Sequence, residues 1–190
     1  MIDTRTRPIA IALAPDGVLS RAGLVLAGSA LLALSARLEI PLPFSPVPVT
    51  AQTLAVLVIG AALGARLGAA TVTLYLVEGI AGLPVYAGGA AGLARLGGPT
   101  GGYLVGFVAA AALVGWAAER GWTRTIVTTL LAMLAGEALI YAFGLAWLSR
   151  FPLSVSPLEA GLFPFIPGDA YKIALAVAVL PPVTRLVART

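Results

Sequence analysis

The chain has 190 residues, of which 59% are hydrophobic and only 11% are charged, and its formal net charge is +4. Because soluble domains carry roughly 25% charged residues, this composition excludes an ordinary soluble protein and indicates a protein that lies in lipid. The sequence contains no cysteine and no histidine, which excludes disulfides, thiol nucleophiles and catalytic triads built on an imidazole. The arginines are scattered between apolar runs, so we expect no nucleic-acid partner.

Six apolar runs approach the length of about 20 residues that a helix needs to cross a bilayer. They predict an all-α membrane protein, a bundle of six transmembrane helices at residues 20–38, 50–65, 67–82, 103–118, 125–148 and 169–187. The second and third runs are short, with only a turn around Gly64 between them. The last run contains Pro181 and Pro182, where we expect a kink or the end of the helix. We expect residues 1–190 to form a single transmembrane domain, with residues 1–19 as a cytoplasmic N-terminal segment and residues 20–187 as the six-helix bundle.

The loops after the first, third and fifth predicted helices are long and rich in proline and glycine. They hold ten of the 14 prolines, and residues 79–106 include ten of the 22 glycines. Loops stiffened by proline suit a preformed binding site, and glycine lets the backbone approach a ligand closely. The ten prolines are Pro41, Pro43, Pro46, Pro48, Pro84, Pro99, Pro152, Pro157, Pro164 and Pro167.

The arginines predict the orientation in the membrane. With six helices, both termini and the loops after the second and fourth helices share one side. That side holds Arg5, Arg7, Arg21, Arg66, Arg120, Arg124, Arg185 and Arg189, against Arg37, Arg95 and Arg150 on the other. Because the cytoplasmic side of a membrane protein carries the excess of basic residues, both termini are expected in the cytoplasm. The long loops would then be extracytoplasmic, on the outer face of the cell inner (cytoplasmic) membrane.

Asp169 and Lys172 are the most informative ionisable residues within the apolar runs. They lie three positions apart, which places them on one face of a helix, and Lys172 is the only lysine. One interpretation is a helix N-cap by Asp169 and a lysine that reaches the membrane interface. The other is a polar pair that faces an occluded pocket, where the carboxylate accepts N–H donors and the ammonium binds an anionic or carbonyl oxygen.

Three further polar residues leave alternatives open. Gln52 offers a donor and an acceptor to a ligand, or forms a hydrogen bond within or between helices. Arg95, in the glycine-rich loop, either pairs with an anionic group or contacts water. Glu137 lies near the middle of a run, and we favour structural hydrogen bonding inside the bundle over an ion path.

With these residues in hand, the chain resembles the BioY family, the biotin-specific substrate-binding (S) subunits of energy-coupling-factor (ECF) transporters. The resemblance rests on four segments, which occur in order along almost the whole chain: residues 40–54, 82–86, 97–103, and 165–169 together with Lys172. Each segment alone is a weak motif. Four in order, within six apolar runs, are specific.

The resemblance implies a function as well as a fold. The chain would capture biotin near the outer face and would be neither an enzyme nor a cofactor-binding protein. Its partners would be a transmembrane coupling subunit (T component) and two ATPase subunits, in addition to membrane lipid, and a homo-oligomer is left open. The first helix would dock on the coupling subunit through Ser29 and Ala33. The substrate-binding residues would be Gln52, Tyr86, Arg95, Asp169 and Lys172.

Two alternatives remain at this stage. One is an intramembrane enzyme, for which Lys172 with a nearby serine or threonine is the only conceivable catalytic pair, and no motif supports it. The other is the substrate-binding subunit of an importer for a different vitamin.

Overall fold

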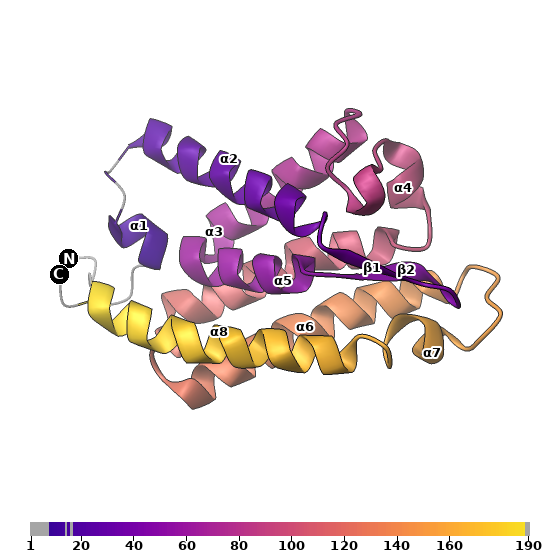
Figure 1. Ribbon diagram of the computed structural model, residues 1–190. Coiled ribbons are helices and arrows are strands. Elements are labelled where there is room, and N and C mark those ends of the chain that lie inside the picture. Colours follow the sequence, from indigo (N-terminus) through magenta and orange to yellow (C-terminus); the bar gives the residue numbers. More distant parts are fainter. Residues whose placement is uncertain (1–7, 14, 16, 189–190) are drawn as a thin grey trace.

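The computed structural model describes residues 8–13, 15 and 17–188. Within these residues, five helices are long and apolar enough to cross a membrane. Four of the predicted runs therefore appear as separate long helices, while the second and third form one element, and the chain is a helical multi-pass membrane protein (Figure 1). The five helices are α2 (Val18–Ser35), α3 (Gln52–Ile80), α5 (Gly101–Glu119), α6 (Ile126–Leu148) and α8 (Ile166–Val187).

Helix α3 folds back on itself at Gly64. This glycine has φ 81° and ψ 177°, a backbone conformation that L side chains rarely adopt. The Nε2 atom of Gln52 donates to the hydroxyl of Tyr75 over 2.8 Å, although a straight helix would separate the two residues by about 35 Å along its axis. A Cβ atom added to Gly68 would lie 3.0 Å from the Cα atom of Gly60. The two arms of α3 are therefore antiparallel neighbours, with the turn where the sequence analysis expects it.

The short elements gather at the two ends of the bundle (Figure 1). One end carries α1 (Ile9–Leu13), the turn with η3 (Trp122–Arg124) and the C-terminal end of α8. The opposite end, which we call the loop end, carries the three proline- and glycine-rich connections. Their elements are β1 (Glu39–Leu42), β2 (Ser45–Thr50), η2 (Ala87–Gly89), α4 (Leu93–Gly97) and α7 (Pro157–Gly161).

The first proline-rich connection is a β-hairpin, which the sequence analysis does not predict. Strand β1 pairs antiparallel with β2, with Glu39 opposite Thr50 and Ile40 opposite Val49. Proline has no N–H group to donate to a ladder, so it normally argues against a strand. In this two-stranded sheet both strands are edge strands, and a proline N atom can face away from the partner strand without loss.

The structure excludes one alternative for each of two features of the last helix. Helix α8 begins at Ile166, and the backbone N–H of Asp169 already donates to the carbonyl of Phe165 over 2.9 Å. Asp169 is therefore not an N-cap. The helix can begin before Asp169 because Pro167 lies in the first turn, where a missing N–H costs nothing. The helix also does not end at Pro181 and Pro182 but continues to Val187.

Small residues bring the helices into close contact around the centre of the bundle. A Cβ atom added to Gly60 of α3 would lie 2.5 Å from the carbonyl oxygen of Ala111 in α5. One added to Gly106 of α5 would lie 3.1 Å from the Cα atom of Ile140 in α6. Glycine at these positions lets backbones approach as they do in other membrane bundles. Helix α5 is thereby fixed between α3 and α6, and these three helices supply much of the wall of the cavity described below.

The arginines divide between the two ends largely as the sequence predicts. Arg5, Arg7 and Arg189 lie outside the described residues. Of the other eight, Arg37, Arg95 and Arg150 belong to the loop end, and the remaining five lie on elements of the opposite end. There, for example, the Nε atom of Arg185 donates to the carbonyl of Arg124 over 2.8 Å.

Candidate ligand-binding site

A cavity lies at the loop end, between β2, α3, α5, α6 and the start of α8. It has about 580 Å³ of empty space, counting the part that is open to solvent, and about 50 Å³ of it admits the centre of a water molecule. The cavity is lined by all five residues that the sequence analysis names for a substrate: Gln52, Tyr86, Arg95, Asp169 and Lys172.

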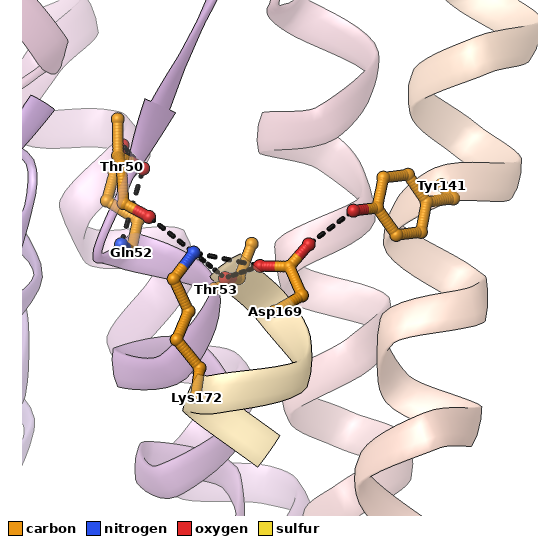
Figure 2. A network of polar contacts seen from close by, with 6 residues as sticks. All are labelled: Thr50, Gln52, Thr53, Tyr141, Asp169 and Lys172. Atoms are coloured by element: carbon orange, nitrogen blue, oxygen red, sulfur yellow. Dashed lines mark hydrogen bonds and ion pairs between the residues drawn. The ribbon is translucent and has the colours of Figure 1, made fainter. Parts of the chain in front are cut away.

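Lys172 is committed to contacts within the protein (Figure 2). Its Nζ atom donates to Oδ1 of Asp169 over 2.8 Å, to the hydroxyl of Thr53 over 3.0 Å and to the carbonyl of Thr50 over 2.7 Å. An ammonium has three N–H groups, so these contacts occupy all of them. Lys172 therefore ties the start of α8 to the junction of β2 and α3.

Asp169 receives hydrogen bonds from three side chains and is 4% exposed. Its Oδ1 atom accepts from Lys172 and, over 3.1 Å, from Thr53, while Oδ2 accepts from the hydroxyl of Tyr141 on α6 (Figure 2). A carboxylate has about four acceptor positions, so about one, on Oδ2, is left for a ligand. The network fixes the carboxylate at the cavity wall and balances its charge with the adjacent ammonium.

Gln52 forms hydrogen bonds within the protein and also lines the cavity. It is 3% exposed, its Nε2 atom donates to the Tyr75 hydroxyl, and its Oε1 atom accepts from the hydroxyl of Thr50 over 3.3 Å. The Tyr75 hydroxyl in turn donates to the carbonyl of Val85 over 3.1 Å. Gln52 thus links the two arms of α3 to the second loop. Its second amide N–H has no partner in the described part of the chain.

The hydroxyl of Tyr86 is occupied by a hydrogen bond within the protein, so only its ring is available to line the cavity. The side chain is 1% exposed, and the hydroxyl donates to the carbonyl of Leu76 over 2.7 Å. Burial raises the pKa of the Tyr86 hydroxyl, which keeps it protonated as a donor. The ring packs edge-on against Tyr75, with 5.6 Å between centroids, and occupies the space where a side chain on Gly79 would be.

Arg95 differs from the other four residues. It lies on the short helix α4, is half-buried, and lines the cavity from the side of the second loop. Among the described residues, its guanidinium has no hydrogen-bond or ion-pair partner. A guanidinium offers five N–H donors in a fork that matches a carboxylate, so Arg95 is the cation at this site that remains free for an anionic group.

The structure adds residues that sequence reasoning missed. Thr53 and Tyr141 complete the network around Asp169, and Thr100, directly before α5, lines the cavity from the loop end. Glu137 also lines it, four residues before Tyr141 on the same face of α6. Its carboxyl group interacts with that of Asp169, in line with structural hydrogen bonding inside the bundle, while its Oε1 atom is buried and has no hydrogen-bond partner in the described region. The four-residue spacing of Glu137 and Tyr141 is the sequence signal that could have indicated this face.

The two residues named for partner docking lie differently from each other. Ser29 is fully buried, and its hydroxyl donates to the carboxylate of Glu78 on α3. Ala33 is half-buried. The exposed small residues of α2 are instead Ala22, Gly23, Ala27 and Ala30.

Comparison with known proteins gives a consistent result. Residues 10–189 match the BioY family. A protein of Rhizobium etli named biotin transporter BioY is 40% identical over 154 residues, 77% of this chain and 82% of that protein. A protein of Pyrococcus horikoshii named probable biotin transporter BioY is 36% identical over 141 residues, 74% of this chain and 83% of that protein. A crystal structure of the S-component for biotin from an ECF-type ABC transporter is similar, with a TM-score of 0.75 and 28% identity, covering 90% of this chain and 94% of that one.

Proposed function

Because the chain belongs to the BioY family, we propose that it captures biotin for uptake as the substrate-binding subunit of an ECF-type importer. It is a transporter component and not an enzyme. The observation that carries the proposal is the cavity at the loop end, which is lined by the largely buried Asp169–Lys172 pair and by Arg95, whose guanidinium has no partner among the described residues. Biotin offers two matching polar ends, a ureido group with N–H donors and a valerate carboxylate, joined by an apolar middle.

We assign each side chain a role in biotin binding from the contacts that it already makes within the protein. Asp169 accepts a ureido N–H at its remaining position, and Gln52 completes the polar contacts of that ring. Arg95 binds the valerate carboxylate, since its donors are free, whereas those of Lys172 are occupied. Lys172 supports binding by holding the Asp169 carboxylate in place. Tyr86 supplies an apolar ring surface.

The membrane arrangement we propose has six spans, with the two arms of α3 each counted as one. The arms are short for a bilayer, which needs about 20 residues per span, and the prolines and glycines of the loop end would extend them toward the outer surface. In this arrangement the protein lies in the cytoplasmic membrane with both termini inside. The gathering of arginines at the end opposite the loops supports that orientation.

Transport requires partners in this proposal. The sequence contains no nucleotide-binding motif, so the energy comes from two ATPase subunits through a transmembrane coupling subunit. Helix α2 docks on the coupling subunit. Since Ser29 is buried against α3, the outward small residues near Ala27, with Ala33 at their margin, form the docking face.

Equilibrium binding to the purified protein tests the capture step. We expect labelled biotin to bind and to be displaced by biotin but not by thiamine or riboflavin. Asp169→Asn should weaken binding by about 2–5 kcal/mol, the usual cost of losing a buried charge-assisted contact. A wild-type protein that binds another vitamin in place of biotin, or only lipid, would overturn the proposal.

A further inference from the structure

We propose that Glu137 is a further ligand contact, which hydrogen-bonds the ureido group of biotin at the floor of the cavity while Thr100 meets the carboxylate end near the mouth. This inference rests on the proposed function and deepens it. It assigns the direction in which the ligand enters, with the ureido ring innermost. It also gives a role to the Oε1 atom of Glu137, which has no hydrogen-bond partner among the described residues.

Two buried polar atoms without hydrogen-bond partners among the described residues belong to residues that line the cavity. In the described part of the chain, four buried side-chain polar atoms have no hydrogen-bond partner, and they belong to Thr100, Arg124, Glu137 and Thr184. Two of the four, Oγ1 of Thr100 and Oε1 of Glu137, belong to residues that line this one cavity. Glu137 is 6% exposed and Thr100 is 8% exposed, so bulk water does not replace the missing partners. Unpaired buried polar groups are costly and rare, and a ligand in the cavity would satisfy both.

Glu137 and Thr100 lie at different levels along the helix bundle. Helices α5 and α6 are antiparallel, with Gly106 packed on Ile140 and Ala110 near Gly136. Glu137 is therefore level with the part of α5 around Ala110. Thr100 immediately precedes α5 at the loop end, so it lies roughly 15 Å from that level along the helix axis. The two unpaired atoms mark opposite ends of the cavity.

The two ends of the cavity differ in their charged groups. Glu137 lies beside Asp169, so the deep end of the cavity carries two carboxyl groups, whereas Arg95 lines the cavity from the loop end. Because Lys172 already offsets the charge of Asp169, the deep end offers a ligand carboxylate no free cation, whereas a neutral ureido ring can donate N–H groups to the carboxyl oxygens. Between the two ends the wall is apolar, with Leu104, Phe107 and Ile140, which suits the thiophane ring and the alkyl chain.

The test measures biotin and biotinamide affinity of the purified full-length protein and the melting temperature without ligand. For Glu137→Leu we expect the Kd of both ligands to rise at least about tenfold, by a similar factor, because the change touches the end that the two ligands share. Glu137→Gln, which keeps a carbonyl acceptor, should lose less. The ligand-free melting temperature of Glu137→Leu should not fall, because the variant removes a buried group that has an unpaired oxygen. A fall in melting temperature without a change in Kd would indicate a structural role and overturn the inference.

A matched pair of hydroxyl variants controls for burial. Thr100→Val and Thr184→Val each remove one buried, unpaired hydroxyl, but Thr184 does not line this cavity. We expect a severalfold rise in the biotin Kd for Thr100→Val and none for Thr184→Val. The reverse orientation of the ligand would make Glu137→Leu bind biotin more tightly, which would also overturn the inference. A wild-type protein without biotin affinity would instead reject the proposed function itself, so the two failures are distinguishable.

Discussion

The Nζ atom of Lys172 lies 2.8 Å from Oδ1 of Asp169, and its other two N–H groups are occupied by Thr53 and Thr50. The only lysine of the chain is thus a brace for the binding site rather than a free cation facing the ligand. The pair is largely buried, with 17% of the Lys172 side chain and 6% of the Asp169 side chain exposed. This relationship separates the structural cation of the site from Arg95, the cation that remains free.

Removing the ammonium should therefore damage both stability and binding. Lys172→Met leaves the buried carboxylate of Asp169 without its counter-charge, and breaking a buried ion pair from one side costs roughly 3–5 kcal/mol of unfolding free energy. We expect a lower melting temperature and weak biotin binding. The double variant Lys172→Met with Asp169→Asn should recover much of the melting temperature but not the affinity. If Lys172→Met alone kept its melting temperature and lost only affinity, Lys172 would be a direct ligand contact.

Replacing Arg95 should weaken biotin binding without lowering the stability of the protein. Because its guanidinium has no partner among the described residues, Arg95→Gln should leave the melting temperature unchanged. It should weaken biotin binding by about 1.5–3 kcal/mol, the value of a hydrogen bond to a charged group, as measured by titration calorimetry. The loss should be smaller with biotinamide, which lacks the negative charge.

Arg150→Gln is the matched control for this experiment. Arg150 also lies at the loop end, but its guanidinium stacks over the Trp147 ring at 5.0 Å and does not line the cavity. We expect unchanged biotin affinity. An equal loss in both variants would mean that the general positive charge of the loop end, and not Arg95 itself, attracts the ligand.

Tyr86 should act through its ring. Tyr86→Phe removes only the hydrogen bond to the Leu76 carbonyl, so we expect a loss of about 1 kcal/mol in stability and little change in affinity. Gly79→Ala places a methyl group where the Tyr86 ring packs, and should cost about 1–3 kcal/mol and weaken binding as the ring shifts. Thermal unfolding and biotin titration of both variants check this. A large loss of affinity in Tyr86→Phe would show that the hydroxyl contacts the ligand.

The sequence predicts those features of the fold that depend on local pattern. The apolar runs locate the long helices, and Gly64 marks the turn within α3 because glycine tolerates the left-handed conformation there. The hairpin of β1 and β2 is missed because its prolines argue against strands. The start of α8 is misplaced because Pro167 is acceptable inside a first helical turn.

The site is predicted only in part, for a different reason. The three-residue spacing places Asp169 and Lys172 on one face, but it does not reveal what that face contacts. Their partners Thr53 and Tyr141 lie 119 and 28 residues away along the chain. Such contacts depend on how helices pack. Glu137 was visible in the sequence as a buried carboxyl group, yet only the packing of α6 against α5 and α8 reveals that it lines the cavity.

Helix α2 offers a test that separates capture from transport. Ala27 is exposed, whereas Ser29, about 200° further around the helix, is buried against α3. We expect Ala27→Trp to leave biotin binding by the purified subunit unchanged, because the residue is remote from the cavity, but to block uptake in cells that produce the coupling and ATPase subunits. Leu26→Trp is the control, since Leu26 is 58% exposed and points about 100° away from Ala27.

The buried position on the same helix should respond in another way. Ser29→Ala removes the hydrogen bond to Glu78 and should lower the melting temperature by an amount equivalent to about 1–3 kcal/mol. Uptake should fall only as far as the amount of folded protein falls, because Ser29 does not reach the surface. If Ser29→Ala abolished uptake at a normal protein level while Ala27→Trp transported normally, the docking face would include the buried side of α2. Helix α2 would then have to turn away from α3 when the partners bind.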